Sequence, residues 1–182
     1  LLVGDVGYSV IEPFIEKFPD RYINTGIAEQ NMVGVAAGLA LAGKRVYVYS
    51  ITPFACMRPF EQIRNDLCYQ QLPVTIVGNG SGFSYAQAGA THHAVEDIAI
   101  MRALPEMLVV APGSAYELTS LMPQLHRQQQ PIYLRLGAAE GEICYPDKPI
   151  QLGSPIELLP SDQALLLATG SALAQGWNLV TD

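Results

Sequence analysis

The chain has 182 residues, of which 49% are hydrophobic and 15% charged, so it can bury the core of one ordinary domain and part of a second. Its net charge of -7, without a cluster of Lys or Arg, argues against nucleic acid or an anionic membrane as the main partner. No apolar run reaches the roughly 18 to 20 residues of a membrane span. The three cysteines, Cys56, Cys68 and Cys144, are far apart and indicate neither a disulfide framework nor a zinc site, which favours a reducing cytoplasm.

The first residues, Leu1-Leu2-Val3-Gly4-Asp5, lack the basic segment of a signal peptide and are typical of a strand. We therefore expect the chain to begin inside a larger protein or to be a naturally short subunit.

Strand-like and helix-like segments alternate along most of the chain. Strands are predicted at residues 1–4, 21–24, 45–49, 74–77, 107–111 and 131–136. Helices are predicted at residues 11–18, 27–41, 59–69, 95–104 and 114–127, the last capped by Ser114 with Glu117 at the capping-box position. This order predicts an α/β fold, a three-layer sandwich in which helices cover both faces of a mostly parallel sheet and ligands bind at the carboxyl ends of the strands.

After Gly137 the pattern changes. Residues 138–160 contain four prolines without sustained periodicity, which is typical of a linker. A strand at 164–168 and a helix from Ala172 are then predicted, and these are too little to bury a core. We expect one domain at residues 1–137, a linker at 138–160, and the beginning of a second α/β domain at 161–182.

The helix at 27–41 is almost entirely apolar or small, which predicts burial on nearly every side. Asn24 and Thr25 can cap it, and Gly43 can end it. Its first turn nevertheless contains Glu29, an ionisable residue that is rarely buried without a partner. From the residues alone, the better explanation is that the helix dipole favours a carboxylate there.

Small residues also mark one side of this helix. Gly34 and Gly38 lie one turn apart, and each lowers the stability of the helix. We expect another part of the assembly to approach the backbone closely at these two positions.

Several motifs, in unbroken order from about residue 1 to 137, resemble those of the pyrimidine-binding domain of the transketolase family. They are Gly26-Ile27-Ala28-Glu29-Gln30-Asn31-Met32, Phe60-Glu61-Gln62-Ile63-Arg64-Asn65, Thr91-His92-His93 and Tyr133-Leu134-Arg135-Leu136. Relatives of that family include deoxyxylulose phosphate synthase, the small subunits of split bacterial transketolases and the β subunits of 2-oxoacid dehydrogenases. Thr169-Gly170-Ser171 resembles the opening of the family's third domain.

The resemblance implies thiamine diphosphate as cofactor and the thiamine diphosphate-binding fold. It assigns to Glu29 the carboxyl that hydrogen-bonds the pyrimidine ring nitrogen and so helps the thiazolium carbon to lose its proton. Phe54 is the best candidate to stack on the pyrimidine, although the sequence favours an ordinary core role equally, and Ile51 is a candidate apolar wall.

Three further residues are assigned to the substrate side. The resemblance makes His92 the active-site histidine, because a neutral imidazole can donate or accept a proton as substrate oxygens change charge. Arg58 could bridge to the substrate, the cofactor or a neighbouring subunit, and Arg135 is a candidate substrate-binding residue.

Three positions depart from the family pattern. Most transketolases have an acidic residue at the position of Ala88 and basic residues at those of Gly80 and Ala138, which contact the sugar and its phosphate. Losing these contacts should weaken selection for sugar phosphates. We expect a non-phosphorylated or differently anchored substrate, such as a modified sugar or a short oxo-compound.

The family's Gly-Asp-Gly and Asn motif, which carries Mg2+ and the diphosphate, is absent from this sequence. A partner domain or subunit should supply it, in a homodimer or an α2β2 assembly. The predicted function is transfer of a two-carbon ketol or acyl unit to an aldehyde acceptor. A β subunit of a 2-oxoacid dehydrogenase and a non-catalytic scaffold with the same fold remain alternatives.

Overall fold

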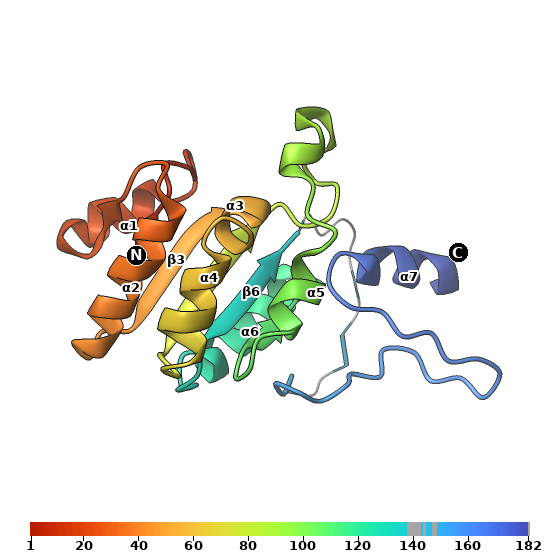
Figure 1. The fold of residues 1–182 in the computed structure, drawn as a ribbon. Coiled ribbons are helices and arrows are strands. Elements are labelled where there is room, and N and C mark those ends of the chain that lie inside the picture. Colours follow the sequence, from red (N-terminus) through yellow and green to blue (C-terminus); the bar gives the residue numbers. More distant parts are fainter. Residues whose placement is uncertain (138–142, 144, 147–148, 182) are drawn as a thin grey trace. The chain divides into compact units, whose positions relative to one another are not determined.

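The computed structural model describes residues 1–137, 143, 145–146 and 149–181 (Figure 1). The chain divides into two compact units. The first contains Leu1–Val110 and Gln129–Leu136, and the second contains Ala111–Gln128 and Gly137–Asp182. Among the described residues, no helix is both long enough and apolar enough to span a membrane.

A six-stranded, all-parallel sheet forms the centre of the first unit, with the strand order β2-β1-β3-β4-β6-β5. Its central strands are rich in β-branched residues and buried, as expected where helices cover a parallel sheet. The predicted α/β fold with a parallel sheet is therefore confirmed. The strands are β1 (Leu2–Val3), β2 (Ile23–Asn24), β3 (Val46–Ile51), β4 (Val74–Asn79), β5 (Leu108–Val110) and β6 (Ile132–Leu136).

The helices of the first unit are short apart from one. They are α1 (Glu12–Lys17), α2 (Glu29–Leu41), α3 (Thr52–Cys56), α4 (Phe60–Gln62) and α5 (Asp97–Arg102), with 3-10 turns at Pro19–Arg21, Ala86–Ala88 and Ala90–His92. The segment predicted as one helix at 59–69 begins as α4 and continues as a π-helix, Ile63–Cys68. No helix was predicted from the sequence at the segment where α3 forms.

The longest of these helices, α2, lies against the sheet (Figure 1). Met32, Val33 and Ala36 are fully buried on that side, in the same core as Val48 of β3 and Ile76 of β4. The small alanine side chains allow the helix backbone to approach the strands closely.

Two expectations about α2 were wrong. Asn24 and Thr25 do not cap it, because the helix begins only at Glu29 and its N-cap residue, Ala28, makes no side-chain capping bond. The Thr25 hydroxyl instead donates to the Val3 carbonyl at 3.1 Å, and the side-chain carbonyl of Asn24 accepts from Gly26 N–H at 2.9 Å. The bond to Val3 of the neighbouring strand and the local bond to Gly26 thus use the two side chains that were expected to cap the helix.

The helix is also not covered all round within the chain. Its exposed side contains Gln30, Asn31, Gly34, Gly38 and Leu41. A Cβ atom added at Gly34 or Gly38 would meet no other atom within 4 Å. The close approach expected at these glycines is therefore not made by the described part of the chain.

The second unit contains helices α6 (Ala115–Leu125) and α7 (Ala172–Thr181). Ser114 caps α6 as predicted, its hydroxyl accepting from Glu117 N–H at 3.1 Å, while the Glu117 carboxylate accepts from Gly113 N–H at 2.7 Å. The strand predicted at 164–168 is wrong, because this segment joins no sheet and its leucines are exposed. Part of the predicted linker, including Ala138 and Cys144, lies outside the described residues.

Candidate active site

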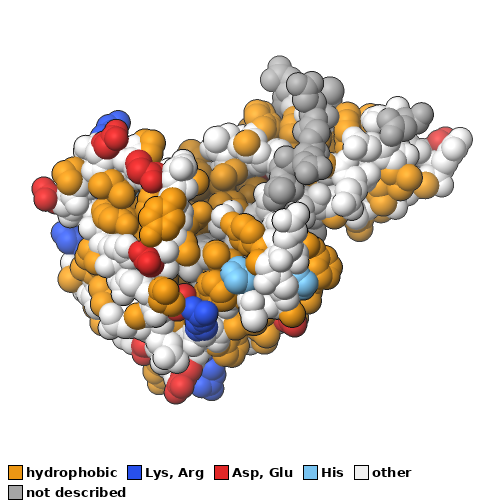
Figure 2. Space-filling view, turned by 90° about the horizontal axis from the view of Figure 1, so that it is seen from above, with side chains coloured by type: hydrophobic (Ala, Val, Ile, Leu, Met, Phe, Trp, Pro, Cys, Tyr) orange, Lys and Arg blue, Asp and Glu red, His pale blue; other side chains and the backbone are white. Residues whose placement is uncertain are grey.

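The carboxyl ends of three strands lead into the segments that carry four of the predicted site residues. Glu29 follows β2, Phe54 follows β3, and His92 follows β4. The chain crosses from β2 over β1 to β3, so the strand order reverses beside β1. Such a switch point opens a crevice at the strand ends, where ligands of α/β proteins bind. Figure 1 shows the loop that contains the two 3-10 turns Ala86–Ala88 and Ala90–His92 rising beyond β4, and Figure 2 shows histidine side chains among hydrophobic ones on this face.

Glu29 is the first residue of α2 and is buried, with a relative exposure of 3%. Its carboxylate is paired with Arg58, whose Nη1 donates to Glu29 Oε1 at 2.9 Å. The Arg58 side chain is 44% exposed, so the pair joins a buried carboxylate to a cation at the surface. The ion pair satisfies a carboxylate that would otherwise be costly to bury.

Phe54 lies in α3 and is half-buried. The guanidinium carbon of Arg58 lies 3.9 Å from the centroid of the Phe54 ring. A planar guanidinium at this distance stacks on the aromatic face while its N–H groups remain free to bond sideways. Arg58 therefore stacks on Phe54 and bonds to Glu29 at the same time.

An open pocket of about 560 Å³ lies beside this group. It is lined by residues 27–31 at the start of α2 and by Arg58. The pocket thus contains the predicted carboxyl, Glu29, and the cation that covers it.

His92, at the end of the second 3-10 turn, reaches the same group. Its ring packs edge-on against Phe54, with centroids 5.1 Å apart and an interplanar angle of 69°. His92 Nδ1 lies 3.0 Å from the Thr91 hydroxyl. If that hydroxyl donates to Nδ1, the proton of the neutral ring is on Nε2 and can serve a ligand. The structure thus gathers four predicted residues, namely Glu29, Arg58, Phe54 and His92.

The neighbouring histidine, His93, belongs to the interior of the loop. Its ring packs edge-on against Phe83, with centroids 5.0 Å apart, and its Nε2 lies 3.4 Å from the Ala86 carbonyl. Ile51, the last residue of β3, is half-buried and directly precedes α3.

Arg135 belongs to a different cluster, at β6. Its Nε donates to Asp97 Oδ2 at 2.6 Å, and its Nη2 donates to the Ala94 carbonyl at 3.2 Å. The fully buried Asp97 also accepts from the Tyr133 hydroxyl at 2.6 Å. The guanidinium therefore ties β6 to the base of the His92 loop, and its role in binding substrate stays a prediction.

Asp97 was missed in the sequence. The signal was the alternation in β6, since Tyr133 and Arg135 are two residues apart and point to the same side of the sheet. A buried tyrosine and arginine on one side need an acceptor. Cys56 lies close by, and burial raises the pKa of its thiol to about 12. Burial raises the pKa of Tyr133 as well.

Two of the three positions that depart from the family pattern, Gly80 and Ala88, lie in the loop after β4. Gly80 has a φ of +79°, and a Cβ there would run into the ring of Tyr85. The Tyr85 hydroxyl accepts from Asn79 Nδ2 at 2.9 Å, which holds the ring over Gly80. Ala88 is exposed in the first 3-10 turn, and Ala138 lies outside the described residues.

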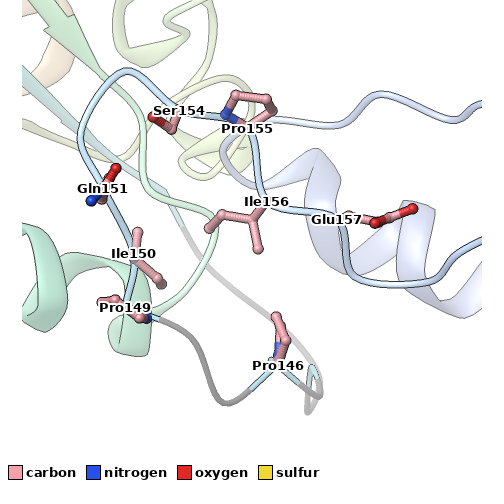
Figure 3. A pocket seen from close by; sticks show the side chains of 8 residues that line it. All are labelled: Pro146, Pro149, Ile150, Gln151, Ser154, Pro155, Ile156 and Glu157. Carbon is pink, nitrogen blue, oxygen red and sulfur yellow. The ribbon is translucent and has the colours of Figure 1, made fainter.

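A second pocket, of about 280 Å³, lies in the second unit (Figure 3). Prolines and isoleucines form most of its lining among the described residues, which also include Glu157. None of the predicted site residues lines it.

The sequence matches the profile of "Transketolase, pyrimidine binding domain" over residues 5–141. It is 38% identical over 164 residues to a subunit of an apulose-4-phosphate transketolase from Actinobacillus succinogenes, covering 90% of this chain and 53% of that protein. It is 35% identical over 168 residues to a 6-deoxy-6-sulfo-D-fructose transketolase subunit from a Clostridium species, covering 92% and 52%. The chain thus spans about half the length of these curated relatives.

A solved structure described as a split gene transketolase, inactive β4 tetramer, superposes with a TM-score of 0.73 at 38% identity. The match covers 85% of this chain and 50% of that one. The sheet and helices described above are thus similar to those of a known transketolase subunit.

Proposed function

The chain belongs to the transketolase family, whose pyrimidine-binding domain it carries, and from that premise we propose that it forms the pyrimidine half of a thiamine diphosphate site. The complete enzyme would transfer a two-carbon ketol or acyl unit from a ketose-like donor to an aldehyde. Residues 1–137 would form the pyrimidine-binding domain, 138–160 a linker, and 161–182 the start of the family's C-terminal domain.

The observation that carries the proposal is the arrangement of Glu29 and Phe54 around a planar group. The Arg58 guanidinium stacks on the Phe54 ring and hydrogen-bonds to buried Glu29. An aminopyrimidine needs the same two contacts, an aromatic face and a carboxyl at its edge. The residues present therefore fit the cofactor that the family implies.

Each residue would have a separate task. Glu29 would hold a proton at the pyrimidine ring nitrogen, while Phe54 and Ile51 would orient the ring and exclude water. His92, whose ring touches Phe54, would move a proton to or from a substrate oxygen. When bound, thiamine diphosphate supplies the carbon that takes up the transferred unit.

The remaining parts of the site would come from elsewhere. A diphosphate-binding domain or subunit would hold Mg2+ and the diphosphate, in a homodimer or an α2β2 assembly. Two relatives are named as subunits of transketolases for apulose-4-phosphate and for 6-deoxy-6-sulfo-D-fructose. These names support a carbohydrate substrate, and the loop around Gly80 favours one that does not depend on a terminal phosphate.

Glu29→Gln in the assembled enzyme tests the proposal. We expect the fold to persist and the exchange of the thiamine C2 proton, followed by NMR, to slow by about two or more orders of magnitude, because an amide cannot share a proton with the ring nitrogen. Glu61→Gln is the matched control, since Glu61 is exposed on α4. Exchange at the wild-type rate in the Glu29 variant would exclude the assigned role.

A further inference from the structure

Arg58 is bound as a ligand would be bound. Its guanidinium lies 3.9 Å above the Phe54 ring, and its Nη1 donates to Glu29 Oε1 at 2.9 Å. Three features therefore coincide at one point, namely a planar cation, an aromatic face and a buried carboxylate. Guanidinium and aminopyrimidine share the property that the aromatic face selects, since both are flat and delocalised, and both can form a hydrogen bond with a carboxyl group at their edge.

The Arg58 side chain can also leave Glu29 and Phe54 without a change in the fold. Glu29 and Phe54 are set on helices packed against the sheet, whereas the Arg58 side chain is long, flexible and 44% exposed. It also forms part of the lining of the open pocket beside Glu29. The guanidinium can thus leave by rotation of its own side chain, without movement of the helices.

We propose that Arg58 is an internal ligand of the pyrimidine site. In the cofactor-free protein its guanidinium takes the place of the aminopyrimidine on Phe54 and Glu29, and it must leave before the ring can enter. This inference rests on the proposed function, because it takes Glu29 and Phe54 as the pyrimidine contacts.

The Arg58 guanidinium and the aminopyrimidine require different protonation states of the Glu29 carboxyl group. Arg58 is a donor and needs the carboxylate as an acceptor. A pyrimidine ring nitrogen is an acceptor and needs a carboxyl that brings a proton. When the ring replaces Arg58, the Glu29 carboxylate therefore takes up one proton from the solvent and shares it with the ring nitrogen. Arg58 keeps the buried carboxylate paired until that exchange occurs.

When Arg58 occupies the site, the cofactor can bind only to the fraction of molecules in which Arg58 has left. The apparent Kd is the Kd of the open site divided by that fraction. If about one molecule in ten is open, the apparent Kd is about tenfold higher than that of a permanently open site. Removing Arg58 should therefore strengthen binding, which is the reverse of what losing a cofactor contact would do.

The test is calorimetric titration of the assembled apoenzyme with thiamine diphosphate and Mg2+. We expect Arg58→Met to bind about tenfold more tightly than wild type, while saturating cofactor raises the Tm of the variant by more than it raises that of wild type. Arg64→Met is the matched control, since Arg64 is an exposed arginine on the π-helix. If the Met variant folds poorly, Arg58→Gln is the second variant. A glutamine side chain is too short to contact Phe54 and Glu29 at the same time.

The outcomes are distinct. Equal or weaker binding by Arg58→Met and Arg58→Gln, with normal binding by wild type, would overturn the internal ligand and leave the proposed function standing. Failure of wild type itself to bind thiamine diphosphate would overturn both.

Discussion

At the level of single residues, Glu29 is a buried carboxylate whose desolvation is unfavourable and is offset by an ion pair. The carboxylate is buried at the start of α2, and its ion pair is with a half-exposed arginine rather than with a buried one. A fully buried pair is hard to separate, because each partner would be left as an uncompensated charge. A partner that reaches the surface loses less on leaving. The geometry therefore favours exchange over permanent stabilisation.

Gly80 and Tyr85 determine whether the loop after β4 can place a basic side chain next to a substrate phosphate. A basic side chain at position 80 would collide with the Tyr85 ring and would be strained by the positive φ. We expect wild type to show no large gain in kcat/KM for an aldose phosphate over the free aldose. Gly80→Arg alone should not create such a gain, whereas Gly80→Arg with Tyr85→Ala should raise it by about tenfold, as expected for one new charged contact.

Steady-state kinetics of the assembled enzyme on matched aldose and aldose phosphate pairs would measure this ratio. Tyr85→Ala alone is the control. A strong preference of wild type for the phosphate ester would show that another group anchors the phosphate.

Cys56 gives a pH-dependent prediction. Its thiol has a pKa raised to about 12 by burial, from an ordinary value of 9.0. Between these values the unfolded chain releases the proton and the native chain keeps it, so the thiol's contribution to stability is complete below about pH 9 and falls as pH rises toward 12. We expect Cys56→Ala to lose less stability than wild type between about pH 8 and pH 10.5.

Urea unfolding at several pH values in this range would compare the slopes. Cys68→Ala is a useful comparison, since the pKa of Cys68 is raised only to about 11. Parallel slopes for wild type and the Cys56 variant would show that the thiol does not contribute to alkaline sensitivity.

At the scale of elements, the short helices after β3 create the site. Phe54 lies inside α3, and Arg58 follows that helix by two residues, before α4 begins. The spacing of four residues still brings the two side chains together, as it does on one face of a helix. The break between α3 and α4 leaves Arg58 exposed enough to move.

The exposed side of α2 gives a prediction for association. Gly34 has open space in front of it, so Gly34→Ala should stabilise the isolated chain by about 0.5–1 kcal/mol through the lower entropy of its unfolded state. If this side is a subunit contact, the larger Gly34→Leu should weaken association by at least tenfold without unfolding the chain.

Analytical ultracentrifugation over a concentration series would measure association, with thermal unfolding as the check on the fold. Thr119→Leu, on the exposed side of α6, is the control for added apolar surface. Unchanged association of Gly34→Leu would place the subunit contact elsewhere.

At the scale of the whole molecule, the chain matches about half the length of its curated relatives. The residues proposed to contact the pyrimidine lie within the first unit, and the exposed leucines at 165–167 lie in the second. A run of exposed apolar residues with strand-like composition suits pairing with further strands. This supports the proposal that residues 161–182 begin another domain.

We predict that this chain alone shows no Mg2+-dependent binding of thiamine diphosphate. Binding should appear when a diphosphate-binding domain of the family is added, because only that domain would neutralise the diphosphate. Calorimetry with and without Mg2+ would measure both states, and thiamine without its diphosphate is the control ligand. Tight, Mg2+-dependent binding of thiamine diphosphate by the isolated chain would contradict the proposal that a separate domain holds Mg2+ and the diphosphate.

Features that depend on spacing along the chain could be predicted from the amino-acid sequence. Period and composition predicted the parallel α/β sheet and most of its elements, and Ser114 with Glu117 predicted the start of α6. These features are local, because hydrophobic periodicity and capping involve residues within a few positions of one another. From the residues alone, Glu29 was explained by the helix dipole, and its hydrogen bond to a pyrimidine was predicted only from the resemblance.

The tertiary structure alone decided which distant side chains meet. It brought Arg58 onto Glu29, and it tied Arg135 to Asp97. It also left residues 164–168 without a strand partner. Such contacts depend on strand order and on the direction of each side chain, and neither is encoded in local spacing. The turn before α2 failed as a predicted cap for the same reason, because the Val3 carbonyl, brought close by the sheet, accepts the Thr25 hydroxyl.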